Sequence, residues 1–364
     1  SKAADLASLA SASETALNNR NIAYNGAMQV AQRATSATGL GGATSYPTCD
    51  RWNLQGGTAG RLTMTQTADG PSGFANCIKL DCTTADTSVA ADEYLILRQL
   101  FEGQDLQQIK KGTSDAEQIT VSFYVKASGA FNFILELFDR DNTRGVSKLY
   151  ATTTDWVRHE ITFPADTTGA FGDDNANSMD LAFWLHAGSN YTSGTLQTSW
   201  VSNTNANRAA GISSFVSSTD NEFFITGVQM EVGPVATPFE HRSVGQELAL
   251  CQRYYYRHAD HSENSANSSI GIGFYYSSGL IMVYVNFKQS MRSSTPTLEF
   301  ASGSNYYILQ RAGATDGVND FAIQARGTNG CKIENSDEAS GTAGESGIMM
   351  TDNGAAYIAF DAEL

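Results

Sequence analysis

Charged residues are scarce in this 364-residue chain, and basic residues are scarcer still. Only 17% of the residues are charged, against about 25% in an average soluble domain. The 23 Lys and Arg residues are outnumbered by 38 Asp and Glu residues, which gives a net charge of −15. An acidic surface repels both phosphate backbones and anionic lipid head groups. The composition therefore argues against nucleic-acid binding through a basic groove and against docking on an anionic membrane.

Long apolar runs and regularly spaced cysteines are also missing. No stretch approaches the roughly 18 apolar residues that a membrane span needs, so we expect no membrane insertion. The five cysteines are odd in number and scattered, and Cys77 and Cys82 lie too far apart for a CxxC motif. Such cysteines do not make a complete disulfide framework. We expect buried free thiols instead.

The chain carries no recognisable catalytic or nucleotide-binding motif. P-loop, dinucleotide-binding and nucleophile-elbow patterns are absent. A glycosidase needs two carboxylates that flank the scissile bond, and Glu136 and Glu160, both on expected strands, are the available candidates. Acidic residues on strand surfaces are ordinary, so the sequence favours a protein that is not an enzyme. Hydrolysis of a surface polysaccharide is left as a minor alternative.

What the chain does contain is typical of short strands joined by polar turns. Glycine (33), phenylalanine (18) and tyrosine (15) are abundant, and aromatic residues favour strands while glycine favours turns. Segments such as Glu93–Phe101, Phe131–Asp139 and Met179–Ala187 resemble strands, and about nine of them follow one another before residue 233. This pattern predicts an all-β protein with a two-sheet sandwich rather than alternating strands and helices.

We predict three parts along the chain. Residues 1–20 form an attachment segment with a helix over Ala3–Leu17, which is either the end of a coiled stalk or a frayed terminal helix. Residues 21–245 form the first sandwich. Residues 246–364 form a smaller C-terminal β-sandwich, in which a polar linker at His258–Ser269 precedes most of the strands.

The junction between the two sandwiches has a distinctive sequence. Pro238 cannot donate a ladder hydrogen bond, and Phe239 follows it. A short helical or turn segment over Ser243–Arg257 would place Leu248, Cys251 and Tyr255 on one face. We expect these five residues to form an inter-domain or subunit junction.

The same junction, Ile225–Arg257, resembles a segment common in tail-fibre and related structural proteins of bacteriophages and prophages. The similarity lies in Gln229, Glu231 and Gly233, in the stretch Ala236–Glu240, and in the run Glu247–Tyr256. Weaker similarities lie at Asn21–Arg33 with Asp50–Trp52, at Ser290–Thr297, and at Phe360–Leu364. Together these patches extend over most of the chain.

The resemblance implies a carbohydrate-binding-module-like jelly roll, followed by a C-terminal β-domain, in a homotrimer carried by a virion. It further implies contacts with other virion proteins, for which the N-terminal segment is the expected site, and with a host surface glycan or protein. The alternative is a purely architectural capsid or tail decoration, or a stalk protein, without receptor binding.

Candidate ligand-binding residues are aromatic side chains in polar loops, because a sugar ring has an apolar face that stacks on aromatic rings. Tyr191 and Trp200 lie in the segment GSNYTSGTLQTSWVSNTN, and Tyr306 and Tyr307 follow the turn GSN. These four are the best candidates for exposed aromatic rings. Packing beneath a loop or in a subunit interface is the favoured alternative for each.

The sequence predicts no organic cofactor, and it suggests a structural calcium ion. Asp139 and Asp141 lie two residues apart beside a turn in FDRDNTRG, and calcium prefers carboxylate oxygen ligands. No glutamate follows at the spacing of an EF-hand loop. A solvated hairpin turn is the alternative explanation.

Overall fold

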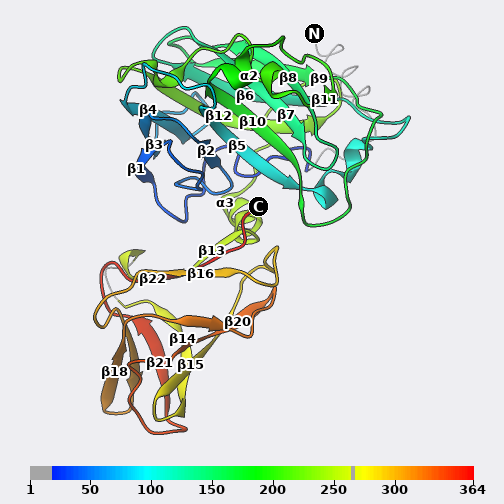
Figure 1. The fold of residues 1–364 in the computed structure, drawn as a ribbon. Helices are drawn as coiled ribbons and strands as arrows, with labels where there is room; N and C mark the ends of the chain where they lie inside the picture. Colours follow the sequence, from blue (N-terminus) through cyan, green and yellow to red (C-terminus); the bar gives the residue numbers. More distant parts are fainter. Residues whose placement is uncertain (1–18, 264–266) are drawn as a thin grey trace. The chain divides into compact units, whose positions relative to one another are not determined.

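The computed structural model describes residues 19–263 and 267–364. The described residues divide between Glu247 and Leu248 into two compact units, each with a hydrophobic core of its own. The fold is all-β, as predicted: a jelly-roll β-sandwich is followed by a smaller β-sandwich (Figure 1). The predicted helix at Ala3–Leu17 lies outside the described residues. Among the helices described, none is long and apolar enough to cross a membrane.

The N-terminal unit consists of two antiparallel six-stranded sheets. The first sheet has the order β1 (Ser36–Leu40), β3 (Arg61–Thr67), β4 (Cys77–Thr84), β12 (Glu222–Val232), β6 (Ile119–Ala127) and β9 (Val157–Phe163). The second sheet has the order β11 (Val201–Ser202), β8 (Arg144–Ala151), β7 (Asn132–Asp139), β10 (Asn177–Ala187), β5 (Tyr94–Glu102) and β2 (Asn53–Gly56). The core fills the space between the sheets, and fully buried Trp52, Phe123, Phe133 and Phe183 are among its largest side chains.

Short helical turns connect these strands. They are η1 (Gly103–Asp105), η2 (Gln107–Ile109), α2 (Ser189–Thr192), η3 (Asn205–Asn207) and η4 (Phe215–Ser217). Most of them lie in the two long connections after β5 and β10. The connection from Gly188 to Ser214 is the longer one and matters for the site described below.

The C-terminal unit consists of a three-stranded and a seven-stranded antiparallel sheet. The smaller sheet has the order β13 (Tyr255–Asp260), β22 (Tyr357–Asp361) and β16 (Thr297–Phe300). The larger sheet has the order β18 (Ala314–Val318), β17 (Tyr307–Arg311), β21 (Ser346–Thr351), β14 (Ser269–Ser277), β15 (Leu280–Asn286), β20 (Gly330–Asn335) and β19 (Ala322–Gln324). One 3-10 turn, η5 (His261–Glu263), follows β13.

The predicted junction segment is helical over a shorter range than expected. Helix α3 runs from Val244 to Gln252, and Leu248 and Cys251 both lie on it. Tyr255 instead begins β13 and pairs with Asp361 of β22, so the prediction that it shares a helical face with Leu248 is wrong. The polar linker predicted from His258 is likewise wrong in its first residues, because His258–Asp260 continue β13. Three consecutive tyrosines, all buried, favour a strand here.

Ion pairs and backbone contacts hold the junction to the start of the first sandwich. The Glu240 carboxylate accepts hydrogen bonds from the backbone N–H groups of Asn19 (2.6 Å) and Asn21 (2.9 Å). Glu247 accepts one from the backbone N–H of Asn25 at 2.6 Å and pairs with Arg242 at 3.4 Å. The Phe239 ring packs against Phe74, with 4.9 Å between centroids, and the Pro238 carbonyl accepts from Arg20 at 3.4 Å. These contacts therefore hold the described start of the chain against the end of the jelly roll.

All five cysteines are free and buried, as expected. Burial raises the pKa of the Cys77 thiol to about 11 and that of Cys331 to about 12. Both thiols therefore stay protonated at neutral pH, and they act as small apolar side chains.

Candidate functional site

The outer face of the second sheet in the N-terminal unit is covered by the chain itself. Along β7 and β10, alternate side chains point away from the core, and Ile134, Ala182 and Trp184 form a second apolar cluster there. Tyr191 of α2 and Ala209 pack onto this cluster from the connection after β10. The sheet face is therefore sealed by residues of the connection between Gly188 and Ser214.

A buried ion pair holds the connection between Gly188 and Ser214 against the second sheet. The Glu136 carboxylate on β7 is fully buried and accepts two hydrogen bonds from Arg208, at 2.8 and 2.7 Å, and one from Trp184 Nε1 at 2.8 Å. The Arg208 guanidinium also stacks over the Trp184 ring at 4.8 Å. Glu160, the other carboxylate considered for glycoside hydrolysis, lies on β9 of the opposite sheet beside Arg158. These two acids therefore do not flank a common cleft.

Two predicted ligand-binding residues of this unit are packed rather than open. Tyr191 is half-buried between Tyr94 (5.7 Å) and Trp184 (5.3 Å). Trp200 is only 9% exposed, and its Nε1 donates to the Pro164 carbonyl at 2.8 Å. The expected exposure is therefore wrong for Trp200. Both residues pack beneath a loop, which is the alternative role predicted for them.

The carboxylates considered for calcium have other partners. Asp139 is fully buried and pairs with Lys111 Nζ at 2.5 Å, while its Oδ1 also accepts from the backbone N–H of Asn142 at 3.0 Å. The Lys111 ammonium group occupies the position beside Asp139 that a calcium ion would need. Asp141 is exposed and accepts from the backbone N–H of Gly172 at 2.9 Å. The structure contradicts a calcium site at Asp139, and the solvated-turn explanation fits Asp141 but not the buried Asp139.

The other two predicted ligand-binding residues lie in the C-terminal unit. Tyr307 is fully buried, and its hydroxyl lies 2.7 Å from the carbonyl oxygens of both Ala301 and Tyr357. Its expected exposure is wrong, because the alternation of β17 turns it into the core beside Leu309. Tyr306 precedes the strand and is half-buried.

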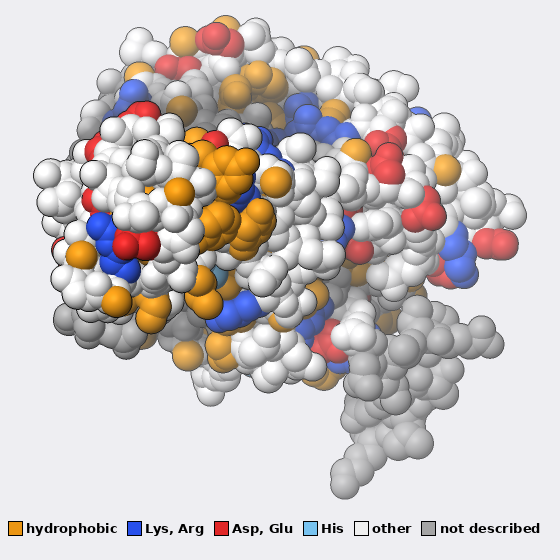
Figure 2. Space-filling view, turned by 90° about the horizontal axis from the view of Figure 1, so that it is seen from below, with side chains coloured by type: hydrophobic (Ala, Val, Ile, Leu, Met, Phe, Trp, Pro, Cys, Tyr) orange, Lys and Arg blue, Asp and Glu red, His pale blue; other side chains and the backbone are white. Residues whose placement is uncertain are grey.

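A different set of apolar side chains is exposed on the seven-stranded sheet. Ile272 (74% exposed), Tyr276 (67%), Tyr284 (61%) and Ile348 (47%) lie on β14, β15 and β21, and half-buried Phe274 stacks on Tyr284 at 6.4 Å. We call these five residues the aromatic face. Figure 2 shows that hydrophobic side chains gather in a patch on the side seen from below. Most exposed apolar residues occur singly, and a contiguous patch of this kind marks a binding surface.

Tyr284 borders a surface cavity of about 410 Å³. Polar side chains of Asn286, Thr328 and Asn329 line it together with the backbone of Gly327 and Gly330. We call Tyr284, Asn286, Thr328 and Asn329 the Tyr284 site. An exposed ring beside amide and hydroxyl groups is the combination that recognises a sugar, whose ring has an apolar face and a rim of hydroxyls.

The backbone positions this site through a close approach between two strands. Asn286 at the end of β15 pairs with Gly330 at the start of β20. A Cβ atom on Gly330 would lie 2.4 Å from the Val285 carbonyl oxygen, so only glycine fits there. Ser290 Oγ lies 2.5 Å from Asn329 Oδ1 and orients that amide, and no partner takes Asn329 Nδ2 within the described part of the chain.

Sequence reasoning missed Tyr284 because its strand is apolar on both faces. In LIMVYVN, Ile281, Val283 and Val285 point into the core and their neighbours point out. With hydrophobic residues at nearly every position, periodicity cannot tell which set is exposed. The sequence holds two weak signals for this site: Asn286 at the end of the strand, and the glycine-rich stretch RGTNG that leads into β20.

No protein-family model matches the chain, and no curated protein matches it. Among solved structures, a family 30 carbohydrate-binding module matches 63% of this chain and 95% of its own length, at 12% identity and a TM-score of 0.31. A family 11 carbohydrate-binding module from Clostridium thermocellum matches 56% of this chain and 99% of its own length, at 11% identity and a TM-score of 0.28. Tailspike protein 4 of bacteriophage CBA120 matches 58% of this chain and 21% of its own length, at 10% identity and a TM-score of 0.29. Similarities this low carry no functional assignment.

Proposed function

We propose that this protein is a fibre or appendage subunit of a phage virion and that it binds a glycan of the host surface through the Tyr284 site. The observation that carries the binding proposal is the exposed Tyr284 ring beside a cavity lined by Asn286, Thr328 and Asn329. The virion role rests on the junction resemblance over Ile225–Arg257. The all-β architecture with a net charge of −15 is compatible with both.

The chemistry of the Tyr284 site suits a weak, neutral ligand. The ring offers a flat apolar surface, and stacking against a sugar places the sugar hydroxyls beside amide groups that both donate and accept hydrogen bonds. Because the cavity lies at the surface and its lining carries no charged side chain, we expect single-site affinity to be low. A homotrimer presents three such sites, and avidity then supplies the strength that one site lacks. In this proposal the trimer forms through surfaces other than the aromatic face, and residues 1–20 contact other virion proteins.

A glycan array probed with the full-length protein tests the binding proposal. We expect the native chain to bind a restricted set of glycans. Tyr284→Ala should abolish these signals, whereas Tyr284→Phe, which keeps the stacking surface, should retain them. Tyr284 is 61% exposed, so neither substitution should unfold the unit, and circular dichroism checks this. Identical array signals from the native chain and Tyr284→Ala would exclude the Tyr284 site.

A purely architectural role is favoured by a separate observation, the exposure of Ile272 and Ile348 on the same face. Aliphatic side chains do not stack on sugars, and an apolar face suits contact with a neighbouring protein. Light scattering separates the two functions through Ile272→Asp. If the aromatic face is a subunit contact, this substitution lowers the particle mass. If it is the ligand-binding face, the mass does not change.

A further inference from the structure

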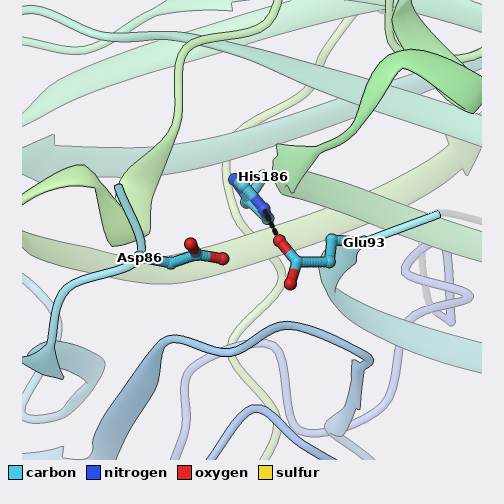
Figure 3. Close-up of side chains that lie close together, drawn as sticks. All are labelled: Asp86, Glu93 and His186. Carbon is cyan, nitrogen blue, oxygen red and sulfur yellow. Dashed lines mark ion pairs between the residues drawn. The ribbon is translucent and has the colours of Figure 1, made fainter. Parts of the chain in front are cut away.

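Three side chains that could hold a metal ion converge at one end of the second sheet in the N-terminal unit (Figure 3). Asp86 lies in the loop after β4, Glu93 directly precedes β5, and His186 is near the end of β10. One ligand atom from each residue lies within 4.8 Å of the other two. This cluster is independent of the Tyr284 site, which belongs to the other unit.

An irregularity in the strand brings His186 into the cluster. The register between β10 and β5 shifts after Trp184, so that His186 pairs with Leu95, whose side chain belongs to the core. The shift has the effect of a β-bulge, which re-aims the side chains that follow it. His186 therefore points inward and is fully buried, although Trp184, two residues earlier, points outward.

His186 has one ring nitrogen without a hydrogen-bond partner. Its Nδ1 lies 2.8 Å from Ser214 Oγ. Its Nε2 is buried and makes no hydrogen bond, and it points at the Glu93 carboxylate from 3.7 Å (Figure 3). In the tautomer that carries its proton on Nδ1, the ring donates to Ser214 and presents a free lone pair at Nε2.

The two acids accept hydrogen bonds from neutral donors, and their side chains also contact each other. Asp86 accepts from Thr58 Oγ1 at 3.1 Å and from the Ser88 backbone N–H at 3.0 Å. Glu93 accepts backbone N–H groups from Ala59 and Ala90, both at 3.2 Å. Within the described ranges, no Lys or Arg pairs with either acid. Two largely buried carboxylates without a basic partner are costly unless a cation or a shared proton neutralises them.

We propose that Asp86, Glu93 and His186 form a binding site for a divalent ion of the zinc class, with one imidazole nitrogen, two carboxylate oxygens and one water as ligands. This donor set suits zinc, which accepts nitrogen and oxygen in a tetrahedral arrangement, whereas calcium prefers six to eight oxygens. Tetrahedral zinc ligands lie about 3.3 Å apart, so the side chains close slightly around the ion. The bound ion ties the loop at Asp86 and the start of β5 to the end of β10.

The competing explanation is a shared proton. A proton bound between the two acids balances the cluster without metal. The two explanations differ in whether the folded protein binds a metal ion at these residues.

Titration of chelator-treated full-length protein with zinc chloride, followed by calorimetry, tests the site. We expect one zinc ion per chain and a higher melting temperature for the zinc-bound protein. Glu93→Gln and Asp86→Asn, which keep the side-chain shapes, should each weaken binding by more than about tenfold. His241→Ala removes an exposed histidine elsewhere and should leave binding unchanged. Cobalt substitution adds a readout independent of stability, because four-coordinate cobalt absorbs strongly in the visible range.

Each other outcome contradicts the proposal. Absence of zinc binding in a folded protein leaves the shared proton as the explanation. Equal zinc affinity in the native chain, Glu93→Gln and Asp86→Asn means adventitious binding at surface groups. Calcium binding without zinc binding shows that the donor set has been assigned to the wrong ion.

Discussion

At the scale of single residues, burial decides roles that residue type alone leaves open. Tyr307 and Tyr284 are both tyrosines in apolar segments, yet one is fully buried and the other is 61% exposed. The sequence context GSNYY favours exposure because turns are polar, but β17 begins at Tyr307 and its alternation turns that ring inward. The ion pair of Asp139 could not be predicted from the local sequence either, because the lysine that neutralises it lies 28 residues away in the chain.

The buried ion pair between Glu136 and Arg208 makes a residue-scale prediction. Glu136→Gln leaves the Arg208 charge without its partner in a largely buried position, so we expect a loss of about 3–5 kcal/mol in the free energy of unfolding. Urea denaturation measures it. Glu117→Gln is the matched control, because Glu117 pairs with exposed Lys110 and should lose about 1 kcal/mol or less. Similar losses in the two variants would contradict the structural role assigned to Glu136.

A second residue-scale prediction concerns acid stability. Burial alone would raise the pKa of Asp166, but hydrogen bonds from Arg144 and Lys111 outweigh it and hold the pKa below its ordinary value. A carboxylate whose folded pKa is depressed stabilises the fold above its unfolded pKa of about 3.9, and this contribution is lost as the pH falls through the folded pKa.

The comparison of native protein and Asp166→Asn at pH 7 and pH 3 tests this linkage. We expect the urea midpoint of the native protein to fall more between these two pH values than that of Asp166→Asn, which has no carboxylate to protonate. Parallel falls in the two proteins would show that Asp166 does not carry the effect.

At the scale of elements, strand positions were predictable and their partners were not. The segments Phe131–Asp139 and Met179–Ala187 are strands β7 and β10 nearly residue for residue, because their apolar runs are bounded by turn residues. The register shift that turns His186 inward and the pairing of β13 with β22, about a hundred residues further along the chain, depend on tertiary contacts that no local pattern encodes. The packing of the connection between Gly188 and Ser214 on the second sheet also depends on tertiary contacts.

This connection makes an element-scale prediction. Tyr191 packs on Trp184, and its carbonyl accepts the Ala209 backbone N–H at 2.9 Å. Tyr191→Ala removes the ring that anchors the connection, so we expect faster amide hydrogen exchange at residues 189–213. Exchange in the core strand β12 should not change, because stability varies locally within a structure. Uniform acceleration across the unit, or none, would contradict the view that the connection is a separately anchored cover.

At the scale of the whole molecule, the fold class followed from composition, whereas the ligand site did not. Abundant glycine and aromatic residues with few charges predict short strands and turns, and both units are β-sandwiches. The candidate site combines Tyr284 of β15 with the turn before β20, about 45 residues later. Neither part is distinctive by itself, and only the pairing of Asn286 with Gly330 brings them together.

Glycan binding at the Tyr284 site can be measured by a binding titration with the glycan that gives the strongest array signal. The native chain, Tyr284→Phe and Tyr284→Ala are compared at equal oligomeric state, confirmed by light scattering. We predict similar affinities for the native chain and Tyr284→Phe, and a loss of about tenfold or more for Tyr284→Ala, because stacking on the ring supplies much of the binding energy. An affinity of Tyr284→Ala equal to that of the native chain would contradict the proposed glycan binding.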